Sequence, residues 1–230
     1  MINAVINKKA DIQLNEDVKT SCVFGLLTLL PAELFWKLLR SSISDGQTLP
    51  KSSGDILNVD FWPRWDVDDN DTDVTNERFV EPDVFVEFEN LDLIIEVKMD
   101  GNSQKESQWI NEVCAYKTYK GNDKTLVFIA LGGNDSIDTY RLTKGKSKNA
   151  LVYKCGWNKL LEAIHSEAEY LEQATFQYDS HVLRTLRKIE ESFVIYGERV
   201  TLWLESIPEN LTCINSNRLY EINEVWKQLK

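Results

Sequence analysis

The pattern of apolar and polar positions predicts helices and strands along most of the chain. Residues 18–42 carry apolar side chains three and four positions apart, which is typical of amphipathic helix packed on a core. Pro31 falls inside this segment, and it must either kink the helix or open a second one, because proline has no backbone N–H. A loop rich in Ser, Gly and Pro is expected at 44–54, and a first strand at 56–65.

The middle of the chain reads as strands joined first by short turns and then by a helix. Strands are predicted at 79–88 and 91–99, and a helix at 104–119. The continuous apolar run 125–131, which ends at two glycines, is typical of a buried strand. Beyond it the pattern predicts a short strand and two helices, at 151–154, 157–171 and 181–196. This order predicts an α/β fold whose first three strands are antiparallel and whose fourth is parallel to its neighbour.

The hairpin of the second and third strands sets three charged residues against one another. If Glu89 and Asn90 form a two-residue loop, the register places Asp83 directly opposite Glu96, with Cβ atoms about 4.5–5.5 Å apart. Lys98 shares a face with Glu96, since strand side chains alternate with period two. A loop with an odd number of residues would instead put the two acids on opposite faces.

Two opposed carboxylates on an otherwise apolar hairpin need a physical explanation. They repel unless one is protonated or a cation lies between them, and buried charges are unfavourable unless paired or bound to metal. One alternative is an ion-pair cluster of Asp83, Glu96 and Lys98 at the end of the sheet. The other is a Mg²⁺ site in which Lys98 acts beside the attacking water and the charge of the transition state.

These residues resemble the motif of the PD-(D/E)XK nuclease superfamily. Pro82-Asp83 is followed by Glu96-Val97-Lys98 with twelve residues between the two acids, and the elements of residues 18–131 are similar to the αβββαβ core of that family. The resemblance implies a restriction-endonuclease-like fold and hydrolysis of nucleic-acid phosphodiesters, most often DNA, with Mg²⁺ or with Mn²⁺ in its place. It also implies that Asp83 and Glu96 are metal ligands, that the Val97 carbonyl is a further ligand, and that Lys98 is the catalytic lysine.

Two accessory positions follow from the same resemblance. Some branches of the family place a Glu on the N-terminal helix, for which Glu33 is the candidate, although it is equally explained as a first-turn acid after Pro31. Other branches place a Gln on the helix after the third strand, which matches Gln108. The distance in sequence from Gln108 to Tyr116 departs from the tight Gln-and-Tyr motif of the exonuclease branch, so Tyr116 is expected in the core.

The charge of the chain is unevenly distributed. The net charge of −11 disfavours a nucleic-acid binder as a whole. However, residues 98–159 hold 11 Lys and Arg against 6 Asp and Glu, whereas residues 1–97 hold 8 against 19. The lysines of this basic stretch are either a phosphate-contacting rim beside the site or a solvated face; they include Lys105, Lys117, Lys120 and Lys124.

An acidic run at 66–77 mimics a calcium-binding loop. Its acids and amides match the first, third, fifth and twelfth positions of an EF-hand, but Asp71 stands where the sharp turn requires Gly. An acidic surface loop is therefore expected. Zinc, serine-hydrolase and P-loop motifs do not occur in the sequence.

The cysteines and the apolar segments bear on location. Four cysteines without a CxxC pair, together with a polar N-terminus, favour reduced thiols in the cytoplasm. The most apolar stretch, 23–39, is interrupted by charged residues, glycine and proline, which argues against a membrane span.

We therefore expect a nuclease-like core at 1–175 and a helical C-terminal extension at 176–230 packed on it. The expected partner is nucleic acid, most often DNA, and the resemblance permits a homodimer. By analogy, such domains fit roles in defence, in repair or in a mobile element. The alternative function is a catalytically silent module of the same fold that acts in protein–protein or nucleic-acid interaction.

Overall fold

The computed structural model describes residues 2–11, 13–66, 79–99, 101–121, 123–174 and 180–200. The chain divides into two compact units, Met1–Arg199 and Val200–Lys230, and the description below concerns the first. The EF-hand-like run lies outside the described residues beyond Asp66, as does the predicted extension after residue 200.

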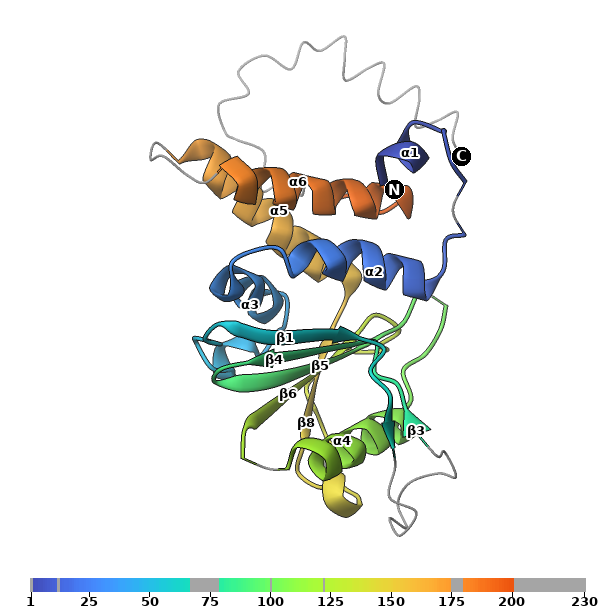
Figure 1. The fold of residues 1–230 in the computed structure, drawn as a ribbon, viewed down its shortest axis with the longest axis vertical. Helices are drawn as coiled ribbons and strands as arrows, with labels where there is room; N and C mark the ends of the chain where they lie inside the picture. Colours follow the sequence, from blue (N-terminus) through green and yellow to red (C-terminus); the bar gives the residue numbers. More distant parts are fainter. Residues whose placement is uncertain are drawn as a thin grey trace, which may run out of the picture. The chain divides into compact units, whose positions relative to one another are not determined.

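The first unit is built on an open, mixed six-stranded sheet (Figure 1). Its strand order is β1 (Ile56–Phe61), β4 (Val84–Phe88), β5 (Leu91–Val97), β6 (Thr125–Leu131), β8 (Leu151–Cys155) and β7 (Tyr140–Arg141). β1, β4 and β5 are antiparallel neighbours, and β6 is parallel to β5, which confirms the predicted topology. β8 is parallel to β6, and the short β7 pairs with it antiparallel at the edge. A separate two-stranded sheet joins β2 (Trp65–Asp66) and β3 (Phe79–Val80).

The predicted register of the β4–β5 hairpin is confirmed. Val84 lies opposite Ile95 and Phe85 opposite Ile94, as a two-residue turn requires. Asp83 comes one residue before β4, so continuing this register places it at the sheet edge where β5 ends.

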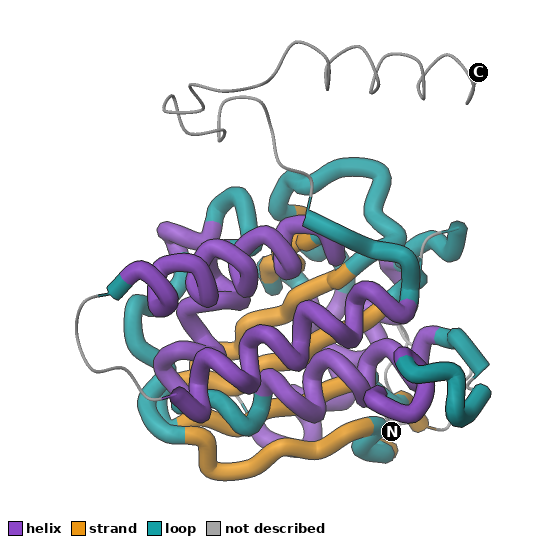
Figure 2. Tube along the Cα trace, turned by 90° about the horizontal axis from the view of Figure 1, so that it is seen from above, coloured by secondary structure: helices purple, strands orange, loops and turns teal. Residues whose placement is uncertain are grey.

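Helices cover both faces of the sheet (Figure 1). Four lie on one side and form the layer seen across the strands in Figure 2: α2 (Glu16–Leu27), α3 (Ala32–Ser41), α5 (Trp157–Gln173) and α6 (Ser180–Ile195). The other face is covered by α4 (Glu106–Lys120). The short α1 (Ile2–Ile6) contacts α6, and two 3-10 turns occur at Gly46–Thr48 and Gly145–Ser147.

The structure gives the bounds of two helical segments that the sequence predicts only approximately. The predicted segment 18–42 is two helices, and Pro31 is the N-cap residue of the second. The predicted helix 181–196 is α6, which packs against α5 and α2 inside the compact unit that ends at Arg199. The helix thus packs on the core, as expected for the start of the C-terminal extension.

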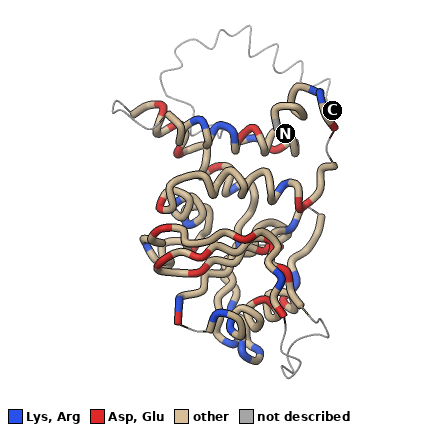
Figure 3. Tube along the Cα trace, in the orientation of Figure 1, with Lys and Arg blue, Asp and Glu red and all other residues tan. Residues whose placement is uncertain are grey.

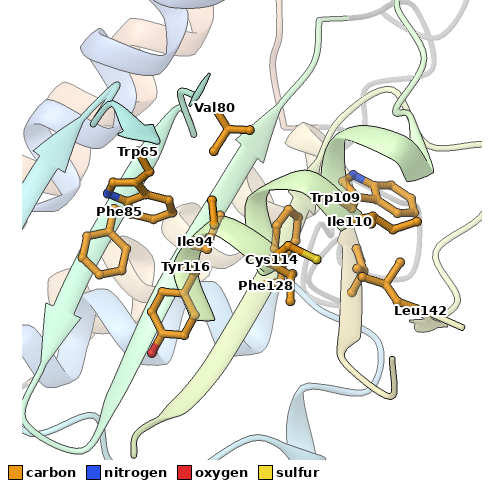
Figure 4. Packing of buried hydrophobic residues seen from close by; sticks show 14 residues of the cluster. Trp65, Val80, Phe85, Ile94, Trp109, Ile110, Cys114, Tyr116, Phe128 and Leu142 are labelled. Atoms are coloured by element: carbon orange, nitrogen blue, oxygen red, sulfur yellow. The ribbon is translucent and has the colours of Figure 1, made fainter. Parts of the chain in front are cut away.

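Apolar side chains fill the space on both faces of the sheet. Toward α4, a row crosses four strands through Phe85, Ile94, Phe128 and Val152, and aromatic side chains pack around it (Figure 4). On the other face, Phe88 contacts the rings of Phe35 and Trp36 of α3, with ring centroids 6.0 and 6.3 Å apart. Burial on both faces explains why β5 and β6 have nearly continuous apolar sequences. Among the described helices, none combines the length and the apolarity that a membrane span requires.

Candidate functional site

Glu96 lies at the end of the sheet that is covered by the start of α4. It follows Ile94 by two residues and so faces α4, one row beyond the apolar row described above. Its neighbour on β6 is Ala130, which has too small a side chain to fill the space beside a carboxylate. Glu96 is only 1% exposed. The fold thus holds a carboxylate where an apolar side chain would be expected from the pattern of the strand.

Asp83 is held beside this position by hydrogen bonds from two neighbouring elements. Its Oδ2 accepts from the backbone N–H of Val97 at 2.7 Å, and its Oδ1 accepts from the indole Nε1 of Trp62 at 3.2 Å. Burial raises the pKa of Asp83, although the hydrogen bond from Val97 and the charge of Lys98 act against this. The side chain therefore has a defined orientation at the end of β5.

Lys98 connects the predicted site residues. Its Nζ donates to Glu96 Oε1 at 2.5 Å, to the Val97 carbonyl at 2.7 Å and to Glu16 Oε1 at 3.2 Å. Burial lowers the pKa of Lys98, but the surrounding carboxylates, Glu96 foremost, outweigh burial and raise it above its ordinary value. The side chain is consequently a charged ammonium group at neutral pH.

Glu16 belongs to the site, although the sequence analysis did not select it. Besides the contact with Lys98, its Oε2 accepts from the backbone N–H of Met99 at 2.9 Å. Glu16 is the first residue of α2, where the side chain of the N-cap residue Asn15 accepts from the Val18 N–H at 2.9 Å. That capping residue was a usable signal, because it starts the helix at Glu16 and puts an acid in its first turn.

Glu33 is not brought to the site, which corrects its selection as the helix acid. Its Oε1 accepts from Ser52 Oγ and from the Gly54 N–H at 3.2 Å. Gly54 packs against Glu89 and Asn90 in the turn at the other end of the β4–β5 hairpin. β5 separates the two ends by about 20 Å at about 3.3 Å per residue. Glu33 therefore stabilises the loop before β1.

Gln108 lies where the sequence places it, beside Glu96. Its Nε2 donates to Glu96 Oε1 at 2.6 Å. Gln104, which comes just before α4, donates from Nε2 to the carbonyls of Glu96 and Gly132 at 3.1 and 3.2 Å. Two glutamines thus tie the start of α4 to the ends of β5 and β6.

Glu112 is a second residue that sequence reasoning missed. It follows Gln108 by one helical turn, is buried, and has its carboxyl group within hydrogen-bonding reach of that of Glu96. Glu96 Oε2 and Glu112 Oε2 are buried and accept no hydrogen bond from the described part of the chain. Two such carboxyl groups require a shared proton or a cation.

The proximity of these acids changes their protonation. Burial, followed by the charge of Asp83, raises the pKa of Glu96 to about 7. Burial and the charge of Glu96 raise the pKa of Glu112 well above its ordinary value. Sequence pattern offers little warning of Glu112, because a Glu in a helix is usually solvated.

The predicted metal ligands are suitable in kind for Mg²⁺. Asp83, Glu96 and the Val97 carbonyl offer hard oxygen donors, and the Lys98 ammonium group already contacts two of these three groups. Mg²⁺ takes few protein ligands and keeps several waters. Within the described ranges, no group of three or more His, Cys, Asp or Glu side chains is arranged to hold a metal ion. The fit therefore depends on two acids, a backbone carbonyl and water.

A cavity of about 540 Å³ lies next to Lys98 at the same edge of the sheet. Its lining comes from the ends of β6 and β8, the start of α5 and the end of α6. Gly132, which has φ of +74°, is required here, because a Cβ atom on it would lie 2.1 Å from the Lys98 carbonyl oxygen. Trp157 Nε1 donates to that same oxygen at 3.0 Å and so closes one side of the cavity.

The structure places most of the basic stretch away from this site. Lys117, Lys120 and Lys124 lie at or beyond the other end of α4, and Lys120 is about 18 Å from Gln108 along the helix axis. Figure 3 shows how Lys and Arg (blue) and Asp and Glu (red) are distributed along the described chain. Lys120 Nζ donates to Glu87 at 2.7 Å, and Lys124 Nζ donates to Asp92 at 3.1 Å. These lysines do not form a rim beside the site, and only Lys105 of those selected lies at the start of α4.

No protein-family model matches the chain, and no curated protein matches it either. The resemblance to PD-(D/E)XK nucleases therefore stands on the residues of the motif and on their arrangement.

Proposed function

We propose that the protein is a metal-dependent nuclease of the PD-(D/E)XK type that hydrolyses phosphodiester bonds in DNA. The observation that carries this proposal is an excess of acid at one edge of the sheet. Three carboxyl groups, those of Glu16, Asp83 and Glu96, surround Lys98, and the buried carboxyl group of Glu112 lies within hydrogen-bonding reach of Glu96. Buried carboxyl groups in such excess need a shared proton or a bound cation, and the second requirement supports a metal site.

The arrangement of elements supports the same class. A helical segment, α2 and α3, precedes three antiparallel strands, β1, β4 and β5, which are followed by α4 and the parallel strand β6. This order is compatible with the αβββαβ order of a restriction-endonuclease-like core and supports the proposal, with Asp83 and Glu96 on the second and third of the antiparallel strands or at their ends.

The proposed roles follow from the contacts. Asp83, Glu96 and the Val97 carbonyl would hold Mg²⁺, which when bound would neutralise charge on the phosphate and lower the pKa of a bound water. Gln108 and Gln104 keep the Glu96 carboxylate and its backbone in place. Because the pKa of Lys98 is raised, we infer that it stabilises negative charge on the reacting phosphate, a role that a charged ammonium group suits better than proton removal.

One observation favours a second candidate function. Lys98 donates to three acceptors within the protein, and both oxygens of Asp83 accept hydrogen bonds. A network this complete is also what a structural ion-pair cluster needs. In that case the chain is a catalytically silent module of the same fold that binds protein or nucleic acid.

Cleavage assays separate the two functions. Supercoiled plasmid and labelled single strands are incubated with Mg²⁺ or Mn²⁺ and with wild type, Lys98→Ala or the matched control Lys159→Ala. Lys159 is an exposed lysine that pairs with Glu162 on α5. Loss of Lys98 should lower the rate by about 10²–10³-fold, which is typical of removing one charge-stabilising group, whereas the control should cleave like wild type.

The other outcomes decide against the proposal in different ways. Equal activity of wild type and Lys98→Ala would assign the cleavage to a contaminant or to another site. Absence of cleavage with both metals and all substrates would favour the silent module.

A further inference from the structure

Trp62 is bound to Asp83 through both of its N–H groups. It follows β1 directly, and its backbone N–H donates to the Asp83 carbonyl at 3.1 Å. Its indole Nε1 donates to Asp83 Oδ1 at 3.2 Å. The ring is therefore held at the sheet edge that carries the candidate site, next to one of its two acids.

The backbone of Trp62 is in an unfavourable conformation. Its φ is +51°, in the left-handed region that glycine and asparagine adopt readily and bulky side chains rarely do. Such a conformation persists only where the surrounding structure enforces it, and it is common at functional sites. Here Trp62 makes two hydrogen bonds to Asp83 in that conformation.

Trp62 is also more exposed than the other described tryptophans. The residue as a whole is 37% exposed, whereas Trp36, Trp65, Trp109 and Trp157 are between 0 and 5% exposed. Its ring packs on Phe61 with centroids 5.7 Å apart and an interplanar angle of 49°. A strained, exposed indole adds little to the core, but it offers a flat apolar surface in a fixed orientation.

We propose that the Trp62 ring stacks on an unpaired base of single-stranded DNA, next to the phosphodiester that the site cleaves. This inference rests on the proposed function and specifies its substrate. Stacking on an aromatic side chain requires a base whose face is free, which a single strand offers and the interior of a duplex does not. The cavity lined by the ends of β6 and β8 lies next to Lys98 at the same edge of the sheet.

The two parts of the side chain have separable roles. The ring binds the base, and the indole N–H makes Trp62 a positioning residue for Asp83. Trp62→Phe keeps an aromatic ring and loses the N–H, whereas Trp62→Ala loses both. Binding should therefore be kept in Trp62→Phe and weakened in Trp62→Ala, because it depends on the ring. The turnover rate should fall in both variants, because it depends on the indole N–H.

Binding is measured by fluorescence anisotropy on the full chain in EDTA, which keeps the DNA intact. The probes are a labelled oligothymidine of about 12 nucleotides, a length within the range that single-strand-binding domains cover, and a labelled duplex of the same length. Trp62→Ala should weaken binding of the single strand by about 5–140-fold, the value of one base–aromatic stack. Trp62→Phe should bind almost as well as wild type, and duplex binding should be little changed in either variant.

Two controls keep the result interpretable. Tyr170→Ala removes another exposed aromatic ring, on α5, and should leave binding unchanged. Trp62→Gly suits the left-handed backbone, so it should fold even if Trp62→Ala does not, and it should bind as weakly as expected for Trp62→Ala. In cleavage assays with Mn²⁺, Trp62→Phe should lower kcat with little effect on KM, and Trp62→Gly should also raise KM.

Each outcome bears on one of the two proposals. Unchanged single-strand binding by Trp62→Gly, an equal loss for duplex, or no binding of the single strand by wild type would overturn the stacking role. If wild type cleaves DNA but the Trp62 variants match it, the inference fails and the nuclease proposal stands. If binding depends on Trp62 but nothing is cleaved, the stacking surface stands and the nuclease proposal fails.

Discussion

Two buried acids on β5 show what distinguishes a structural carboxylate from a candidate catalytic one. Asp92 lies two residues before Ile94 and Glu96 two residues after it, so both side chains face α4, as that of Ile94 does. Asp92 Oδ2 accepts from the Tyr116 hydroxyl at 2.8 Å, and its Oδ1 accepts from Lys124 Nζ at 3.1 Å. Each oxygen of Asp92 thus has a donor, and this confirms that Tyr116 is part of the core.

Glu96 has a different balance of partners. Its Oε1 accepts from Lys98 and Gln108, whereas its Oε2 accepts from no N–H or hydroxyl group of the described residues, and the neighbour within hydrogen-bonding reach of Glu96 is another acid, Glu112. Near Asp92, the acid Glu87 is matched by Lys120 and Lys124. Near Glu96, the described residues add further acids, Asp83 and Glu112, against the one lysine. Burial alone therefore does not distinguish the two acids, whereas the local excess of acid over cation is found around Glu96 and not around Asp92.

The largest expected effect is on the free energy of unfolding, which should respond differently to substitution of Asp92 and of Glu96. Asp92→Ala leaves the Tyr116 hydroxyl and Lys124 without their acceptor, so it should lower the free energy of unfolding by about 2–4 kcal/mol. Glu96→Gln removes a repelled charge and should change stability little, or raise it, while cleavage is lost. Urea unfolding of both variants measures this difference. A loss in Glu96→Gln as large as that in Asp92→Ala would make Glu96 a structural residue.

The next effect is the response to metal. At 10 to 100 times its Kd, Mn²⁺ should raise the free energy of unfolding by about 1.4–2.7 kcal/mol, because it binds only the folded protein. Thermal unfolding with Mn²⁺ and with EDTA should show this shift in wild type and in Asp92→Asn. Asp83→Asn should not show it, since one ligand is removed. An equal shift in Asp83→Asn would place the bound ion elsewhere.

The smallest effect is a pH dependence of the free energy of unfolding, measured in EDTA so that no metal ion is bound near Glu96. Burial raises the pKa of Glu112 in the folded protein. At any pH between the pKa of Glu112 in the unfolded chain and its pKa in the folded protein, the folded protein therefore holds a proton that the unfolded chain has released. The free energy of unfolding should therefore fall as pH rises above the ordinary pKa of Glu, by at most about 1.4 kcal/mol per pH unit for one proton.

The matched variants test which group is responsible for that slope. Glu112→Gln should reduce the slope to the part that Glu96 and Asp83 contribute, because the pKa values of these two acids are also raised, and it should be more stable than wild type at pH 8. Glu162→Gln, which removes a partly exposed acid of α5, should keep the full slope. An undiminished slope in Glu112→Gln would mean that Glu112 does not carry the proton.

The sequence by itself determined the hairpin and the three residues of the motif. A two-residue turn sets the register of β4 and β5, and the period of two then puts Asp83, Glu96 and Lys98 together at one end. The bounds of β6 agree with the prediction because its apolar run ends at Gly132, where only glycine fits. Strand alternation and turn length are local properties, so local sequence is sufficient for them.

Only the tertiary structure decided which other residues join the site. Glu16, Glu112 and Trp62 reach it, whereas Glu33 and the lysines at the end of α4 do not. Each of these outcomes depends on which end of a helix or strand meets which edge of the sheet. Spacing along one helix cannot reveal that, because the contacts join segments up to 83 residues apart, as Glu16 and Met99 show. Packing of α2 and α4 on opposite faces of the sheet is the physical reason that these acids meet.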